Sequence, residues 1–175
     1  MKDTPKEEKL PALLTHPWAP VYDKRSKILI LGTFPSPASR EYGFYYGHSQ
    51  NIFWLTLSQV LDKPCPLDKS SKIKFLRNND IALWDVLYSC EIAGASDSGI
   101  KNPTPNDFKP LIEKSKISVI FTTGKKATEL FQKLCSREVG MEAIYLPSTS
   151  PANRASQKKA KFLEQWETIK IFLDK

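Results

Sequence analysis

The chain has 175 residues, a length that indicates one domain, and 41% of the residues are apolar, as in ordinary globular proteins. No apolar stretch reaches the roughly 18 residues of a membrane-spanning helix, and the charged N-terminus lacks the apolar centre of a signal peptide. We therefore expect a single soluble, intracellular domain over residues 1–175, in which residues 1–10 form a flexible tail.

The three cysteines and two histidines argue against a metal site. Cys65, Cys90 and Cys135 lie far apart and have no C-x-x-C spacing, so we expect free thiols. We expect neither a disulfide framework nor a structural zinc ion or iron–sulfur cluster. The net charge of +7 suits a polyanionic partner, because neutralising phosphates releases counterions, although many basic proteins bind no nucleic acid.

Residues 11–27 contain three prolines, so we expect this segment to wrap over the surface without a long helix. Four short apolar runs then have the length of strands buried on both faces, at residues 27–31, 81–84, 118–122 and 143–146. Apolar residues at helical spacing lie between and after them, at residues 51–61, 72–79, 105–114, 125–134 and 157–173. This alternation predicts an α/β fold in which helices cover both faces of a mostly parallel sheet.

The loops that follow the four strands are expected to meet, because ligands bind where the carboxyl ends of parallel strands open. The first loop carries Phe34, Tyr45 and Tyr46, whose rings suit stacking on a flat, polar-edged group such as a nucleobase. Asn51 is either an N-cap of the next helix or an amide that orients water or bonds a base, and both roles can coexist. Asp85, at the end of the second strand, either accepts a base N–H or caps a turn.

Two later loops suit phosphate groups. Lys125 and Lys126 follow Gly124 at a predicted helix start, where backbone N–H groups attract anions, although a solvated lysine pair is the simpler alternative. The last loop supplies hydroxyls, an amide and cations over residues 147–159, which grip DNA phosphates or merely form a turn and a helix cap. Its expected position beside the first loop favours the phosphate interpretation. The small polar loop at residues 95–103 is either a solvated connection or part of the site.

Four segments stand in a characteristic order: LGTFPS at residues 31–36, YGHSQNIFW at 46–54, LWDVL at 83–87 and LPSTSPAN at 146–153. In this ordered set the chain resembles the uracil-DNA glycosylase superfamily, and more narrowly its hypoxanthine-DNA glycosylases. Residues 97–106 also fit, and the resemblance runs from about residue 15 to the C-terminus. It implies a three-layer α/β/α sandwich around a four-stranded parallel sheet. It also implies a monofunctional glycosylase that removes deaminated bases from DNA without a metal or cofactor.

The resemblance makes Asn51 the leading catalytic candidate, because it is the amide that matches the hypoxanthine branch. Relatives specific for uracil often carry Asp or Asn in the first loop, where this chain has Phe34. They often carry His or Asn before the Pro-Ser of the last loop, where this chain has Leu146, and a bulky apolar wedge where it has Ser150 and Pro151. The sequence therefore reveals no strong general base.

In the implied mechanism the base is flipped out of the DNA, and Asn51 positions the attacking water or stabilises the departing base. The residues expected to bind the base are Thr33, Phe34, Tyr46, His48, Asp85 and Asn102. The residues expected to bind the DNA are Pro35, Ser36, Lys125, Lys126, Ser148, Thr149, Ser150, Asn153 and Arg154.

The expected partner is duplex DNA that contains hypoxanthine, with uracil and xanthine as further candidate bases. We expect a monomer that contacts no membrane and lies in the cytoplasm or nucleoid, or in the nucleus of a eukaryote. Two alternatives use the same fold: a non-catalytic DNA-binding module, and a hydrolase of free nucleosides or nucleotides.

Overall fold

The computed structural model describes residues 11–92 and 99–174. The expected tail at residues 1–10 and the first part of the polar loop at residues 95–103 lie outside these ranges. None of the described helices combines the length and the apolar character that crossing a bilayer requires.

The predicted parallel sheet is confirmed, and each predicted strand begins and ends within one residue of an observed one. The strands are β2 (Ile28–Gly32), β3 (Ile81–Asp85), β6 (Val119–Thr123) and β7 (Ala143–Leu146). Their order is β3-β2-β6-β7, and neighbouring strands are parallel throughout. The central strand β2 is fully buried from Ile28 to Leu31, which explains why its sequence is a continuous apolar run.

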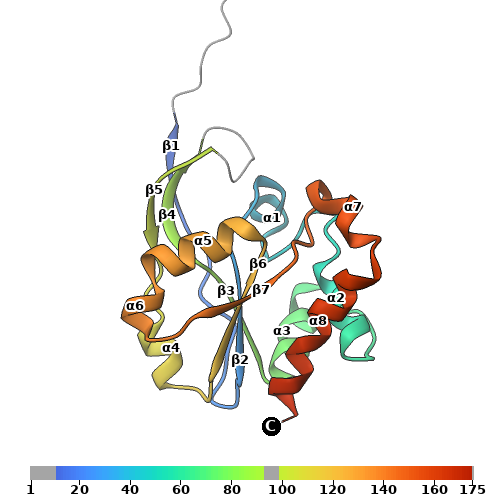
Figure 1. The fold of residues 1–175 in the computed structure, drawn as a ribbon. Helices are drawn as coiled ribbons and strands as arrows, with labels where there is room; N and C mark the ends of the chain where they lie inside the picture. The colour runs from blue at the N-terminus through green and yellow to red at the C-terminus, as the bar shows by residue number, and fades with distance from the viewer. Residues whose placement is uncertain (1–10, 93–98, 175) are drawn as a thin grey trace, which may run out of the picture.

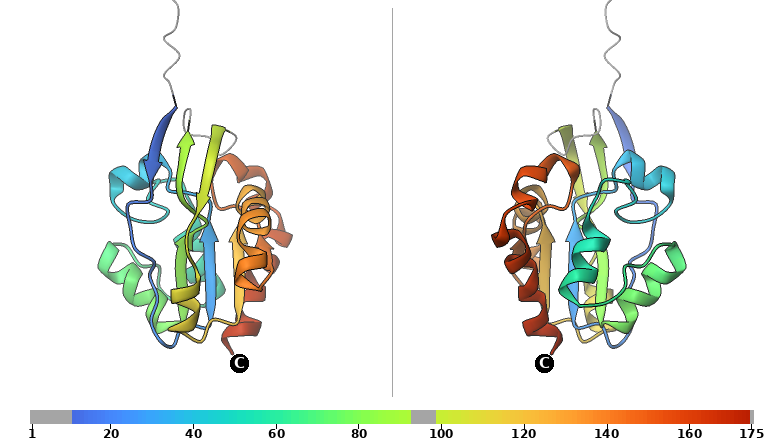
Figure 2. Two further views of the ribbon diagram at one scale, coloured as in Figure 1. Left: turned by 90° about the vertical axis from the view of Figure 1, so that its left-hand side faces the viewer. Right: turned by 90° about the vertical axis from the view of Figure 1, so that its right-hand side faces the viewer.

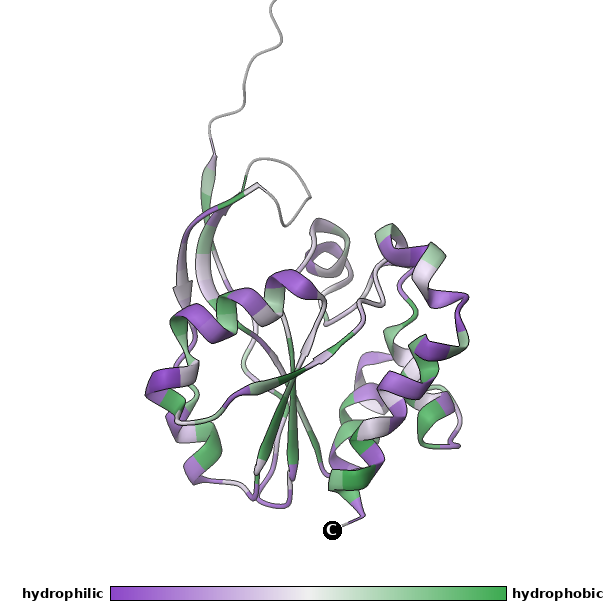
Figure 3. Ribbon diagram, in the orientation of Figure 1, coloured by the Kyte–Doolittle hydropathy of each residue, from purple (hydrophilic) through white to green (hydrophobic). Residues whose placement is uncertain are grey.

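Helices cover both faces of this sheet, as Figure 1 and the side views in Figure 2 show. One face carries α2 (Phe53–Val60), α3 (Lys69–Asn78) and α8 (Ala160–Leu173); the other carries α4 (Lys109–Glu113), α5 (Lys125–Leu134) and α6 (Ser136–Val139). Along β2, Ile28 and Ile30 enter one core, and Leu29 and Leu31 enter the other. The predicted α/β/α sandwich is therefore confirmed, and Figure 3 shows the apolar residues concentrated in its central strands.

The structure adds a second sheet that the sequence pattern does not predict. Its strands are β1 (Ala12–Thr15), β4 (Leu87–Ile92) and β5 (Ile100–Pro105), which are antiparallel in the order β1-β4-β5. Residues 11–27 thus contain no helix, as expected, but four of them form a strand. The helix expected over residues 105–114 is shorter than predicted, because Pro105 ends β5 and α4 begins only at Lys109. Shifts in the register between β4 and β5 leave no regular alternation to recognise.

Side-chain capping sets the starts of two helices, α1 and α3. The unpredicted α1 (Pro37–Tyr42) begins where the Ser36 hydroxyl accepts the Ser39 N–H, and it ends at Gly43 in the left-handed conformation. Helix α3 begins three residues before the predicted start, because Asp68 and Ser71 form a capping box. The helix predicted over residues 157–173 is α8, which begins three residues later at Ala160. The unpredicted 3-10 helix η2 (Pro151–Asn153) and helix α7 (Arg154–Gln157) precede it.

Candidate functional site

Four loops meet at the carboxyl edge of the parallel sheet. The loop after β2 reaches the loop after β3 through the Val86 N–H, which donates to the Gly32 carbonyl at 2.8 Å. The Ile52 N–H, just before α2, donates to the Thr149 carbonyl in the last loop at 3.2 Å. The Gly124 N–H after β6 donates to the Leu146 carbonyl at the end of β7 at 2.8 Å. Segments more than 90 residues apart in sequence are therefore in direct contact at one rim.

Asp85 and Tyr46 lie together over the backbone of Gly32, the last residue of β2. A Cβ atom at position 32 would overlap the Asp85 Oδ1 atom and would lie 2.9 Å from the Tyr46 hydroxyl oxygen. Glycine is thus the residue that lets a carboxylate and a phenol approach the end of the central strand. The Tyr46 hydroxyl also pairs with the Thr123 hydroxyl at 3.0 Å, which ties the end of β6 to the same point.

A histidine that the sequence analysis did not assign to the site holds the Asp85 carboxylate. The His16 Nε2–H donates to Asp85 Oδ2 at 2.8 Å, and the two side chains are only 2% and 6% exposed. The His16 Nδ1 atom lies 2.9 Å from the Trp18 carbonyl oxygen and 3.2 Å from the Trp18 N–H. The rings of Trp18, Phe34 and Trp84 meet the imidazole edge to face. His16 and Asp85 therefore form a buried pair surrounded by aromatic rings, whereas the sequence pattern identified only Asp85.

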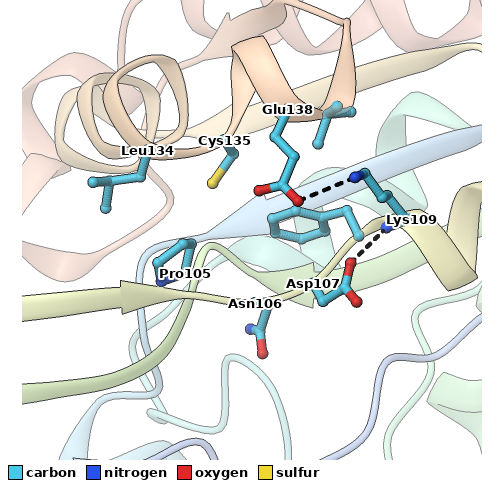
Figure 4. Close-up of a pocket in the computed structure, with 9 residues that line it drawn as sticks. Pro105, Asn106, Asp107, Lys109, Leu134, Cys135 and Glu138 are labelled. Atoms are coloured by element: carbon cyan, nitrogen blue, oxygen red, sulfur yellow. Dashed lines mark hydrogen bonds and ion pairs between the residues drawn. The ribbon is translucent and has the colours of Figure 1, made fainter.

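An amide that was also not assigned to the site supports the same aspartate. The Asn106 Nδ2 donates to the Asp85 backbone carbonyl at 2.9 Å, and the Asn106 N–H donates to the Val86 carbonyl at 2.8 Å. In Figure 4 the Asn106 amide points away from Cys135 and Glu138, which line a cavity of about 10 Å³ that holds at most one water. Asn102, which was expected to bind the base, lies exposed on β5 with φ 48°.

The aromatic residues of the first loops are mostly packed against protein. Thr33 and Phe34 are 7% and 8% exposed, and Phe34 belongs to the core beneath β2, so its ring is covered by protein. Tyr46 is half-buried, and one face of its ring stacks on Phe53 at a centroid distance of 3.9 Å. Tyr45 is buried and its hydroxyl donates to the Ala19 carbonyl at 3.0 Å. Burial, and after it the charge of Asp85, raises the pKa of Tyr45 far above its ordinary value, so this phenol stays protonated.

The turn before α2 fixes the orientation of Asn51. Its Oδ1 accepts the Phe53 N–H at 2.9 Å in an Asx turn, whereas the N-cap of α2 is Ile52 and not Asn51. The Nδ2 group makes no hydrogen bond with any described residue, and it is the free donor of the amide. His48 builds the same turn, because its carbonyl accepts the Asn51 N–H and its Nδ1 accepts the Gln50 N–H. His48 is therefore a turn residue on the rim.

The last loop uses most of its polar groups internally. The Ser148 hydroxyl accepts the Ser150 N–H and the Ser150 hydroxyl accepts the Ala152 N–H. Asn153 donates from Nδ2 to the Ser148 carbonyl at 2.9 Å. The turn-and-cap alternative therefore describes these three side chains. Thr149 differs: it is 1% exposed, and its Oγ1 is buried without a hydrogen-bond partner among the described residues.

The cations stand around this loop. Lys125 and Lys126 open α5 next to the last loop, where a Cβ on Gly124 would lie 3.3 Å from the Ser148 Cβ. Arg154 begins α7 and is exposed, whereas Pro35 is buried and the Ser36 hydroxyl caps α1. A depression of about 230 Å³ beside the loop is lined by residues that include Tyr145, Asn153, Lys159 and Lys161. In the described part of the chain no three His, Cys, Asp or Glu side chains are grouped as a metal site would require.

The rim combines a held carboxylate, a tyrosine hydroxyl, a free amide donor and surrounding cations, which together suit a flat base with N–H and carbonyl groups attached to a polyanion. The family model of the uracil DNA glycosylase superfamily matches residues 19–170. A hypoxanthine DNA glycosylase of Methanosarcina acetivorans is 36% identical over 151 residues, which cover 85% of this chain and 93% of the relative. A hypoxanthine DNA glycosylase of Methanosarcina barkeri is 34% identical over 144 residues, which cover 81% and 90%.

A solved structure has the same fold. It is the solution NMR structure of a candidate uracil DNA glycosylase from Methanosarcina acetivorans, and it matches with a TM-score of 0.78 and 32% sequence identity. The match covers 94% of this chain and all of the solved chain.

Proposed function

The chain belongs to the uracil DNA glycosylase superfamily, and from this premise we propose that it is a monofunctional DNA glycosylase that releases hypoxanthine from DNA. The observation that carries the proposal is the meeting of Asp85, Tyr46 and the Asn51 turn at one sheet edge. Hypoxanthine is the first candidate base because both named relatives are hypoxanthine DNA glycosylases. Uracil and xanthine present the same pairing of a ring N–H with a carbonyl, so they are the further candidates.

The base is recognised from one side of the rim. The Asp85 Oδ1 atom lies over Gly32 and receives no hydrogen bond from the described residues, so it can accept a ring N–H. The Tyr46 ring stacks on Phe53 at a centroid distance of 3.9 Å, which holds the tyrosine in place at the rim. A base that stacks on an aromatic ring of this rim would gain roughly 1–3 kcal/mol, which offsets part of the few kcal/mol that extrusion from the duplex costs.

Asn51 acts in this scheme as a hydrogen-bond donor. Its Oδ1 is taken by the Phe53 N–H, so the group that it presents to a ligand is Nδ2. An amide donor does not remove a proton from water; it stabilises the negative charge that develops on the departing base, or it holds the water in position. In the reaction, the bond between C1′ and the base nitrogen breaks with its electron pair on the base. Water adds to C1′, and the proton lost by the water is balanced by the proton gained by the base.

The DNA backbone is held by charge around the last loop. Lys125, Lys126 and Arg154 surround the loop, while Ser148, Ser150 and Asn153 keep its shape. We propose that these residues bind phosphates of duplex DNA, the cations directly and Ser148, Ser150 and Asn153 by holding the loop in shape against the backbone. The excess of positive charge over the whole chain, +7, acts in the same direction.

The test is base release from duplexes that carry one hypoxanthine, uracil, xanthine or adenine at the same position. We expect free hypoxanthine and an alkali-labile abasic site, with little release of adenine. Binding to all four duplexes without release of any base would identify a non-catalytic DNA-binding module. Cleavage of free deoxyinosine without cleavage of the duplex would identify a nucleoside hydrolase.

A further inference from the structure

We propose that His16 is a positioning residue that makes Asp85 a selective reader of bases with a ring N–H beside a carbonyl. This inference rests on the proposed function, because it explains how that site would separate hypoxanthine from adenine. Deamination turns the N1 atom of adenine, a hydrogen-bond acceptor, into the N1–H donor of hypoxanthine. A reader that can only accept hydrogen bonds therefore distinguishes the two bases.

The contacts fix both ends of the Asp85 side chain. His16 occupies Oδ2 at 2.8 Å, and Asn106 and β3 hold the Asp85 backbone. The remaining oxygen, Oδ1, is directed to the rim over Gly32, beside the Tyr46 hydroxyl. A carboxylate has no donor of its own, so the oxygen that is left can only accept a hydrogen bond.

The imidazole itself has little freedom to turn away. The His16 side chain is 2% exposed and is enclosed by the rings of Trp18, Phe34, Tyr45 and Trp84 at centroid distances of 5.8 to 6.4 Å. The Trp18 backbone places both an acceptor and a donor near Nδ1, so Nδ1 finds a partner with or without a proton. In either case Nε2–H remains directed at Asp85.

The energetic consequence follows from the burial of the pair. Removing the His16 donor would leave a carboxylate in a side chain that is only 6% exposed without its hydrogen bond to His16, and the side chain would turn toward another donor. The direction of Oδ1 would then no longer be fixed. The binding of hypoxanthine would then have to fix the orientation of the carboxylate, and this cost lowers the affinity for hypoxanthine. The affinity for adenine, which has no N1–H for the carboxylate to accept, would not change.

The experiment compares two amides at position 16. His16→Gln places its amide nitrogen near the position of Nε2, within reach of Asp85, whereas His16→Asn places its amide nitrogen near the position of Nδ1, beside Trp18. Both changes are polar, so they control for loss of the ring. Affinity is measured for duplexes that carry uncleavable 2′-fluoro analogues of deoxyinosine and deoxyadenosine, and release is measured on ordinary hypoxanthine duplexes.

We expect the wild type and His16→Gln to prefer the inosine analogue, and His16→Asn to lose about 10- to 100-fold of that preference while its affinity for the adenosine analogue is unchanged. Asp85→Asn is expected to lose the preference as well, because an amide can turn its NH₂ group toward N1 of adenine. Equal selectivity in His16→Asn and the wild type would overturn the inference, and so would selectivity retained by Asp85→Asn. Failure of the wild type to release any base would overturn the proposed function instead, and the two failures are therefore distinguishable.

Discussion

The Ile52 N–H donates to the Thr149 carbonyl across 3.2 Å, so the turn that carries Asn51 and the last loop are one connected structure. This contact joins the amide proposed to act on the base to the loop proposed to hold the DNA. A substitution in the Asn51 turn or in the last loop should therefore affect base release alone, or DNA binding alone, only when it leaves this backbone contact intact.

Asn51→Ala should abolish most turnover and also lower stability, because the side chain both offers Nδ2 and accepts the Phe53 N–H. Asn51→Ser should keep a side-chain acceptor for the Phe53 N–H and remove only the amide donor. We expect both variants to lose about 10²–10³ in kcat, and only the alanine variant to lose about 1 kcal/mol of unfolding free energy. Single-turnover release of hypoxanthine and urea denaturation test this. Wild-type turnover in the serine variant would remove Asn51 from the chemistry.

Thr149→Val should leave the protein at least as stable as the wild type, because the Thr149 Oγ1 is buried without a partner among the described residues. If the hydroxyl is completed by a water or a phosphate in the complex, affinity for a duplex with an abasic-site analogue should fall about fivefold, or ~1 kcal/mol. Thr149→Ala is the control, since it also removes a buried methyl group and should be less stable. A drop in thermal stability of the valine variant would show that the hydroxyl already has a partner in the free protein.

Gly32→Ala should inactivate the enzyme, because its Cβ would overlap the Asp85 carboxylate and press on the Tyr46 hydroxyl. We expect a loss of about 1–3 kcal/mol in stability together with loss of hypoxanthine release. Gly140→Ala is a matched control: its φ of 71° is unfavourable for alanine, but no atom lies within 4 Å of the new Cβ. The two variants should lose similar stability while only Gly32→Ala loses activity. Equal activity in both would argue that nothing binds over the end of β2.

Lys125→Ala should weaken binding to duplex DNA regardless of its base composition, and should reduce the slope of log K against log salt by about one. Lys133→Ala, near the other end of the same helix, changes the net charge equally but lies away from the last loop. Fluorescence anisotropy over a range of salt concentrations measures both slopes. Identical slopes for the two variants would mean that Lys125 contributes only to the overall positive charge of the protein and contacts no phosphate.

Cys135 should resist alkylation at pH 8. Burial, and after it the charge of Glu138, raises its pKa to about 12, so almost no thiolate is present. Its thiol faces the small cavity in Figure 4. Cys65 is half-buried and should react first with iodoacetamide, followed by mass spectrometry of the modified peptides. Preferential labelling of Cys135 under native conditions would contradict this order.

The parallel sheet was accessible from the sequence because each of its strands is a short apolar run. Burial on both faces was expected for all four strands and holds for β2, β3 and β6, but it is wrong for the edge strand β7, where Ile144 and Tyr145 are exposed. The second sheet was not accessible from the sequence, because β4 and β5 are partly exposed and shift in register, and Pro103 and Pro105 lie in β5. In the sequence alone, prolines at these two positions indicate a loop followed by the start of a helix.

The same distinction applies to the site. Asp85, Tyr46 and the last loop follow from the rule that loops meet at the carboxyl edge of parallel strands. His16 does not follow, because it lies 69 residues from Asp85 and precedes every strand of the parallel sheet. The position of His16 depends on β1, which ends at Thr15 and pairs with β4, and on the contact of the imidazole with the Trp18 backbone. Asn102 and Asn106 are four residues apart in a polar stretch of the sequence, and only the fold shows that Asn106 donates a hydrogen bond to the Asp85 carbonyl.

The pairing of β1 with β4 has a practical consequence for how the protein is shortened. A fragment trimmed to residues 19–170, the span matched by the superfamily model, would retain the whole parallel sheet and still lack the imidazole. Because the fragment lacks His16, we expect it to bind DNA but to distinguish hypoxanthine from adenine poorly.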